Sequence, residues 1–176
     1  MNVVNRGNEM SRAFVKEPDG DEVAEDLPER PRSPHTNYVT PQGLRLLRTR
    51  LNELLQSRAA LAGRDDLASR QQIAAIERDL RYFGQRIECA VLVDPEAQPE
   101  DRVHFGATVE VVDEEGATHR FVIVGEDETA IAQGKISWVS PLARALLNAR
   151  VGDVVTWRRP AGDRELEVLS IHQGTP

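Results

Sequence analysis

The chain has 176 residues, of which 40% are hydrophobic and 29% are charged, and its formal net charge is −7 at pH 7. This length accommodates one domain or two small ones, and the composition is that of an ordinary globular protein. No apolar run approaches the roughly 18 residues that a membrane helix needs, and the N-terminus lacks a secretory signal. Cys89 is the only cysteine, so an intramolecular disulfide is excluded and a cytoplasmic location is expected.

Charge is unevenly distributed along the sequence. Residues 1–39 carry a net charge of −3, residues 40–90 carry +3, and residues 91–176 carry −7. Binding to free nucleic acid depends on Lys and Arg neutralising phosphates, so the acidic total argues against it. The four histidines show no metal-ligand spacing, and we expect no stably bound metal or other cofactor.

Residues 1–37 are predicted to form a disordered, acidic tail. The segment is polar, and several prolines interrupt any helix. Such a sequence buries too little apolar surface to offset the entropy lost on ordering. The prolines are Pro18, Pro28, Pro31 and Pro34.

Residues 38–93 are predicted to form an antiparallel coiled-coil arm. Thr40 can cap a helix that has Pro41 at its first position. Apolar residues then recur at alternating steps of three and four, which is the spacing of a coiled-coil seam, with Arg58 as one charged interruption. After a break at residues 63–66, a second seam follows, and two seams joined by a short break favour a helical hairpin. The seams are Leu44, Leu47, Leu51, Leu54 and Leu61, then Ile73, Ile76, Leu80, Phe83 and Ile87.

Residues 94–176 show the alternating pattern of β-strands. Residues 113–116 read as a hairpin turn, 136–139 as a short strand, and 160–163 as the turn of a last hairpin. Ser140-Pro141 is a capping pair before a short helix. The fold class predicted for the whole chain is therefore α+β, with a small antiparallel β domain carrying one short helix.

Several local strings resemble the Gre family (GreA/GreB) of bacterial transcript cleavage factors. The resemblance covers about residues 37–173, and the longest C-terminal string is the most specific. The matching strings are NYVTPQGL (37–44), IERDLRY (76–82), FGATV (105–109), IVG (123–125), ISWVSPLA (136–143) and RVGD (150–153).

The resemblance implies an FKBP-like C-terminal domain and an accessory factor to RNA polymerase rather than an enzyme. Family members bind bacterial RNA polymerase at its secondary channel, so nucleic acid is met only indirectly, inside the elongation complex. By this likeness Ser140, Pro141 and Leu142 are candidate polymerase-docking residues. Asp65 and Asp66 are candidate acidic residues of the arm tip, sharing Mg²⁺ with the polymerase. A monomer is expected, because the arm pairs with itself.

Two departures from the family pattern leave the activity open. The tip lacks the acidic residue followed three places later by Glu-Asn-Ala, and Asp65 and Asp66 serve equally well as helix caps. The hairpin is also shorter by about one heptad per helix, or about 10 Å. Short-armed relatives, including the regulator of nucleoside diphosphate kinase, occupy the channel without the cleavage tip. A non-cleaving regulator that competes with other Gre factors is therefore the alternative.

Two further readings come from other classes of protein. An FKBP-like fold raises prolyl isomerisation, but fold alone does not give function, and few aromatic residues follow residue 100. A coiled-coil scaffold is the remaining reading if the chain does not bind polymerase.

Overall fold

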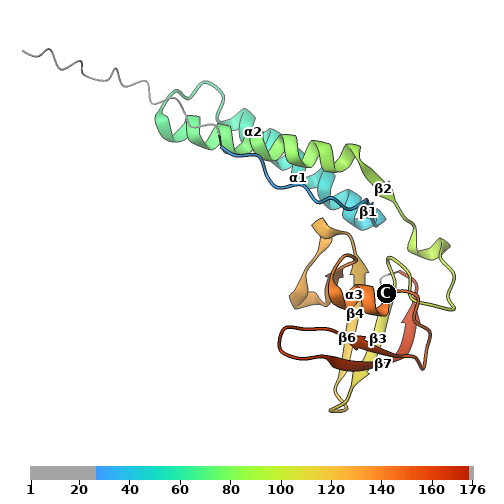
Figure 1. Ribbon diagram of the computed structural model, residues 1–176. Coiled ribbons are helices and arrows are strands. Elements are labelled where there is room, and N and C mark those ends of the chain that lie inside the picture. The colour runs from blue at the N-terminus through green and yellow to red at the C-terminus, as the bar shows by residue number, and fades with distance from the viewer. Residues whose placement is uncertain (1–26, 175–176) are drawn as a thin grey trace, which may run out of the picture.

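The computed structural model describes residues 27–174 and shows a mixed α+β architecture. A pair of long helices forms an arm that extends away from a separate β-rich domain (Figure 1). No helix in the described part of the chain is both long enough and apolar enough to cross a membrane.

The arm consists of helices α1 (Pro41–Ala60) and α2 (Leu67–Glu88), which pack along each other. The Thr40 hydroxyl accepts a hydrogen bond from the Gly43 backbone N–H at 2.9 Å, which caps α1 in the manner its sequence predicts. Residues 61–66 reverse the chain, so the two helices run antiparallel. Their buried contact is made by seam residues, namely Leu54, Leu61 and Ile76, with Ile73, Leu80 and Phe83 partly buried beside them.

Residues 27–36 have no regular secondary structure, but they lie along the arm (Figure 1). Here the chain differs from the disordered tail expected for residues 1–37, because aromatic and charged side chains of α2 supply contacts that the local sequence does not reveal. Residues 1–26 of that predicted tail lie outside the described residues. Strand β1 (Asn37–Val39) follows and pairs in parallel with β2 (Ala90–Leu92), which ties the start of α1 to the end of α2 at the base of the arm.

The second domain is built on a five-stranded sheet of order β5-β4-β3-β7-β6. Strand β3 lies at its centre and pairs antiparallel with both β4 and β7, while β6 pairs antiparallel with β7. The strands are β3 (Thr108–Asp113), β4 (Thr118–Val124), β5 (Lys135–Ser137), β6 (Val154–Trp157) and β7 (Arg164–His172).

The sheet is mixed, which corrects the antiparallel sheet predicted from the sequence. Strand β5 pairs with β4 in parallel. A parallel neighbour needs a connection that returns to the starting end of the sheet, and residues 125–134 provide it through two 3₁₀ turns, Glu126–Glu128 and Ile131–Gln133. Gly134, at a φ of 71°, ends that return in a left-handed conformation that favours glycine.

Helix α3 (Pro141–Leu146) packs against the sheet and closes the main core. The core combines inward residues of β3, β4 and β7 with the buried face of α3, and the burial of these apolar side chains is the main stabilising term of the domain. Its members include Val109, Val111, Ile123, Leu142, Leu146, Leu166 and Val168.

Candidate functional site

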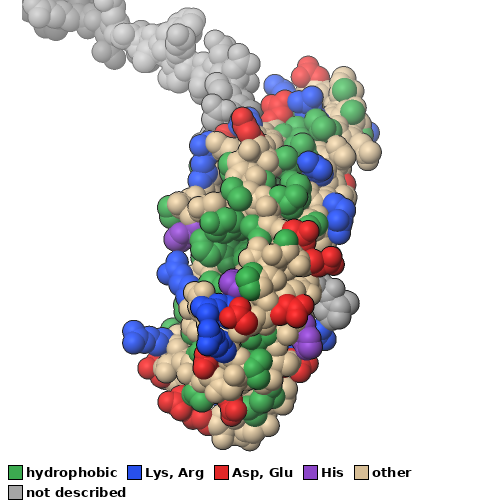
Figure 2. All heavy atoms as spheres, turned by 90° about the vertical axis from the view of Figure 1, so that its right-hand side faces the viewer, with side chains coloured by type: hydrophobic (Ala, Val, Ile, Leu, Met, Phe, Trp, Pro, Cys, Tyr) green, Lys and Arg blue, Asp and Glu red, His purple; other side chains and the backbone are tan. Residues whose placement is uncertain are grey.

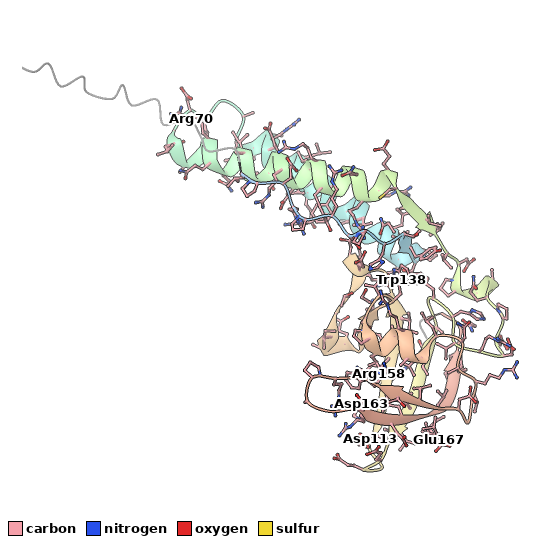
Figure 3. All side chains as sticks on the ribbon, viewed as in Figure 1. Arg70, Asp113, Trp138, Arg158, Asp163 and Glu167 are labelled. Carbon is pink, nitrogen blue, oxygen red and sulfur yellow. The ribbon has the colours of Figure 1, made fainter. Side chains whose placement is uncertain are left out.

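The tip of the arm holds the two predicted acidic residues next to each other, at the end marked by Arg70 in Figure 3. Asp66 is the N-cap of α2. Its Oδ1 accepts a hydrogen bond from the Ser69 backbone N–H at 3.0 Å, and its Oδ2 accepts one from the Ser69 hydroxyl at 2.7 Å. These two hydrogen bonds lower the pKa of Asp66, because they stabilise the ionised carboxylate.

Asp65 is almost fully exposed, with a side-chain exposure of 97%, and lies 3.8 Å from the Arg70 guanidinium. An exposed ion pair of this length contributes little to stability. Within residues 27–174, no three His, Cys, Asp or Glu side chains gather where they could hold a metal ion. The tip thus offers one carboxylate used as a helix cap and one pointing into solvent.

Replacing Asp66 with alanine is expected to fray the first turn of α2, whereas Asp66→Asn keeps the cap and Asp65→Ala changes little. Because the folded-state pKa of Asp66 is lowered, its contribution to stability is complete above the ordinary pKa of aspartate. It is lost as the pH falls through the folded-state pKa. Amide hydrogen exchange at Ser69, followed by NMR, measures both effects. Equal protection of Ser69 in Asp66→Ala and wild type would contradict the capping role.

The predicted docking segment surrounds the N-terminus of α3. The Ser140 hydroxyl accepts a hydrogen bond from the Ala143 backbone N–H at 3.2 Å, so it caps the helix. Leu142 is only 4% exposed and belongs to the main core, whereas Pro141 is exposed. Of the three candidates, Leu142 thus holds α3 on the sheet, and Pro141 and the partly exposed Ser140 are the two that reach the surface.

A charged network connects the arm to the β domain, and sequence reasoning missed it. Arg86, near the end of α2, is 8% exposed. Its Nε donates a hydrogen bond to Asp127 Oδ2 at 2.6 Å, and an Nη atom lies 3.5 Å from Glu126 Oε2. The Tyr82 hydroxyl donates to the other Asp127 oxygen at 2.9 Å. One acidic turn of the β domain therefore holds two successive turns of α2.

The pKa shifts in this network keep both partners in their bonded forms. Burial alone would lower the pKa of Arg86, but the hydrogen bond and charge of Asp127 raise it above its ordinary value. Burial and the negative charge of Asp127 also raise the pKa of Tyr82. Arg86 thus stays charged and Tyr82 stays a neutral donor across the physiological pH range.

A second polar contact joins the start of α1 to the same turn. The Thr40 hydroxyl donates a hydrogen bond to Glu128 Oε2 at 2.6 Å while it caps α1. Lys135 approaches the other Glu128 oxygen at 3.3 Å. Glu128 is 7% exposed, and its charge is therefore buried together with a cation and a donor.

Aromatic rings complete the junction. Trp138, labelled where the arm meets the β domain in Figure 3, lies 5.1 Å from the Tyr38 ring in an edge-to-face arrangement. Tyr38 also contacts Phe105 at 5.8 Å. Trp138 follows β5 rather than lying in the strand predicted for residues 136–139, and it is partly buried and packs against the core.

The arm exposes part of its apolar surface. In the view of Figure 2, apolar side chains gather over the arm. Exposed large apolar residues of the arm include Leu46, Leu55 and Leu67. The polar and aromatic contacts of the junction join this arm to the β domain.

Comparison with known proteins identifies the family. Residues 98–173 match the family described as "Transcription elongation factor, GreA/GreB, C-term". Transcription elongation factor GreB of Neisseria meningitidis serogroup B is 39% identical over 151 residues, covering 77% of this chain and 93% of the relative. Transcription elongation factor GreA of Alkalilimnicola ehrlichii is 41% identical over 106 residues, covering 59% of this chain and 67% of the relative.

Among solved structures, the GreA factor homolog 1 (Gfh1) protein of Thermus thermophilus is 29% identical. The match covers 78% of this chain and 99% of that protein, with a TM-score of 0.38. The sequence matches define an accessory factor of transcription rather than an enzyme. The chain belongs to the GreA/GreB family of transcription elongation factors.

Proposed function

We propose that this elongation factor binds bacterial RNA polymerase at its secondary channel and modulates elongation there. The β domain docks at the rim through the surface around Ser140 and Pro141, and the arm enters the channel. Nucleic acid is met only inside the elongation complex, and the factor acts as a monomer. Family membership and the resemblance of the docking string support this proposal.

The observation that carries the proposal is the arm held on its base by the Arg86–Asp127 network. Helix α2 has 22 residues, which corresponds to about 33 Å at about 1.5 Å per residue. The buried ion pair at its base holds the arm on the β domain. When the β domain docks, the position of the tip is therefore also determined. A channel-entering factor requires that connection, whereas a flexible linker would not provide it.

The geometry of the tip favours the non-cleaving alternative. A Mg²⁺ ion shared with the polymerase would supply stabilisation of charge during phosphodiester hydrolysis. Asp66 already uses both carboxylate oxygens on Ser69, and Asp65 is the carboxylate left for such an ion. Asp65 alone would leave nearly all the ligands of a shared Mg²⁺ to the polymerase, so we propose a regulator that occupies the channel and competes with cleaving Gre factors. Any Mg²⁺ would be bound only within the complex.

The test uses purified bacterial RNA polymerase stalled on a backtracked template. We expect no shortening of the RNA by this protein alone, but a reduced rate of cleavage by a separate Gre factor. The variant Asp65→Asn/Asp66→Asn removes both charges and keeps a capping side chain at position 66, so it should compete equally well.

Each other outcome has a defined meaning. RNA shortening that the double variant abolishes would assign cleavage to this chain and overturn the non-cleaving alternative. Neither shortening nor competition would contradict binding in the channel altogether.

A further inference from the structure

Residues 27–36, which we call the strap, contact both parts of the molecule although they contain no helix or strand. The strap leads directly into β1 and lies along the arm (Figure 1). An extended segment holds such a position only if its side chains make enough contacts to offset the entropy of ordering. The contacts described next identify what holds it.

On the arm, Arg30 is the main anchor of the strap. Its guanidinium lies over the Tyr82 ring at 3.9 Å and near the Phe83 ring at 5.2 Å. It also lies 3.8 Å from the Asp79 carboxylate. A guanidinium held over one ring face and beside another, with a carboxylate nearby, combines cation–π and ionic attraction.

A neighbouring ion pair reinforces this anchor. Arg81 contacts the Glu29 carboxylate at 2.6 Å through an Nη atom and at 2.8 Å through Nε. Both partners are more than half exposed, so this pair contributes less than Arg30 does.

At the other end, the strap contacts the β domain. The His35 ring meets the Trp138 ring edge-to-face at 5.9 Å. Between its two ends, an open pocket of 420 Å³ is lined by the strap, by α2 and by the acidic turn of the β domain. The lining residues are Arg30, Pro31, Ser33, Tyr82, Phe83, Arg86, Glu126 and Asp127.

The position of Tyr82 makes the strap more than a passive covering. One side of Tyr82 carries Arg30, and its hydroxyl donates to Asp127 of the β domain. The strap therefore braces the same residue that ties the arm to its base. Loss of Arg30 would free one face of Tyr82 and open one wall of the pocket.

We propose that the strap is a positioning segment that sets the direction of the arm relative to the β domain, with Arg30 as its anchor on the arm and His35 as its contact on the base. This inference rests on the proposed function, because the direction of the arm decides whether a docked factor enters the channel. The arm's direction is measured in the free protein, so the positioning role of the strap is tested independently of polymerase binding.

The experiment measures spin-label distances in the full chain by double electron–electron resonance. In a Cys89→Ser background, labels at Gln72→Cys and Glu167→Cys report the arm's direction, and labels at Pro28→Cys and Gln72→Cys report attachment of the strap. Arg30→Ala is expected to raise the detached population of the strap about tenfold, which a loss of about 1.4 kcal/mol produces. It should also broaden the distance distribution between the arm and the β domain.

Arg32→Ala is the matched control, since Arg32 is an exposed arginine of the same strap. It should leave both distributions unchanged. A detached strap with an unchanged distance between the arm and the β domain would overturn the proposal, as would an attached strap in the Arg30→Ala variant. If Arg30→Ala broadens the distribution but the protein never binds polymerase, the positioning role stands and the proposed function fails.

Discussion

Arg86→Ala is expected to lower the free energy of unfolding by about 3 kcal/mol, the lower end of the range for a broken buried ion pair. Arg86 is 8% exposed, and its removal leaves Asp127 and Glu126 close together without their cation. The Tyr82 hydroxyl remains as a donor to Asp127, which is why we expect the lower end of the range. Urea denaturation followed by circular dichroism measures the loss.

Two comparisons separate the network from a general effect of losing an arginine. Arg70→Ala removes an arginine of the same helix whose side chain is 55% exposed, and its expected effect is within about 0.5 kcal/mol. A double-mutant cycle with Asp127→Ala should show strong coupling, because the two side chains share a hydrogen bond. Additive effects of Arg86→Ala and Asp127→Ala would show that the pair does not act as a unit.

The expected loss has a functional counterpart. Arg86 joins α2 to the β domain at the base of the arm, far from the tip that carries Asp65. A variant that stays folded but loses this pair should keep its docking surface and lose the defined position of its tip. Competition with a cleaving Gre factor should then weaken more than binding to the polymerase does.

Local signals explain why the arm could be predicted from sequence. The cap at Thr40, the seam spacing and the break at residues 63–66 each depend on neighbours within one or two helical turns. The same locality made Asp66 ambiguous, because a cap and a metal ligand use the same carboxylate. The hydrogen bonds to Ser69 show that Asp66 caps α2, and its role as a ligand of Mg²⁺ stays a prediction.

Long-range contacts explain what the sequence did not reveal. Arg86 and Asp127 are 41 residues apart, and Arg81 and Glu29 are 52 apart. No spacing rule connects such pairs, so the acidic turn was not recognised as the base of the arm and the strap was taken for a tail. The run of Glu126, Asp127 and Glu128 is visible in the sequence, but only its burial in the structure makes nearby cations necessary.

The direction of β5 was missed for a related reason. Three residues define a strand but not its orientation, which depends on the path of the preceding connection. The 3₁₀ turns at Glu126–Glu128 and Ile131–Gln133 have weak local signatures, and they decide the outcome. The burial of Leu142 was not predicted either, because a helix of six residues is too short for periodicity to separate its buried face from its exposed one.

Leu142→Ala is expected to destabilise the β domain by about 2–5 kcal/mol, the range for truncating a buried leucine. Leu142 is 4% exposed and packs in the same core as Leu146 and Ile123. Pro141→Ala changes an exposed neighbour at the first helical position, and its expected effect on stability stays within about 1 kcal/mol. Thermal and urea denaturation of the two variants measure the difference.

This contrast decides how any loss of polymerase binding should be interpreted. If Leu142→Ala binds weakly, its lowered stability accounts for the loss through a shifted α3, without a direct contact. If Pro141→Ala binds weakly while its stability is unchanged, the exposed ring at the start of α3 is part of the docking surface. A Leu142→Ala variant that unfolds like the wild type would show that α3 does not depend on this side chain, and Leu142 would return as a candidate contact.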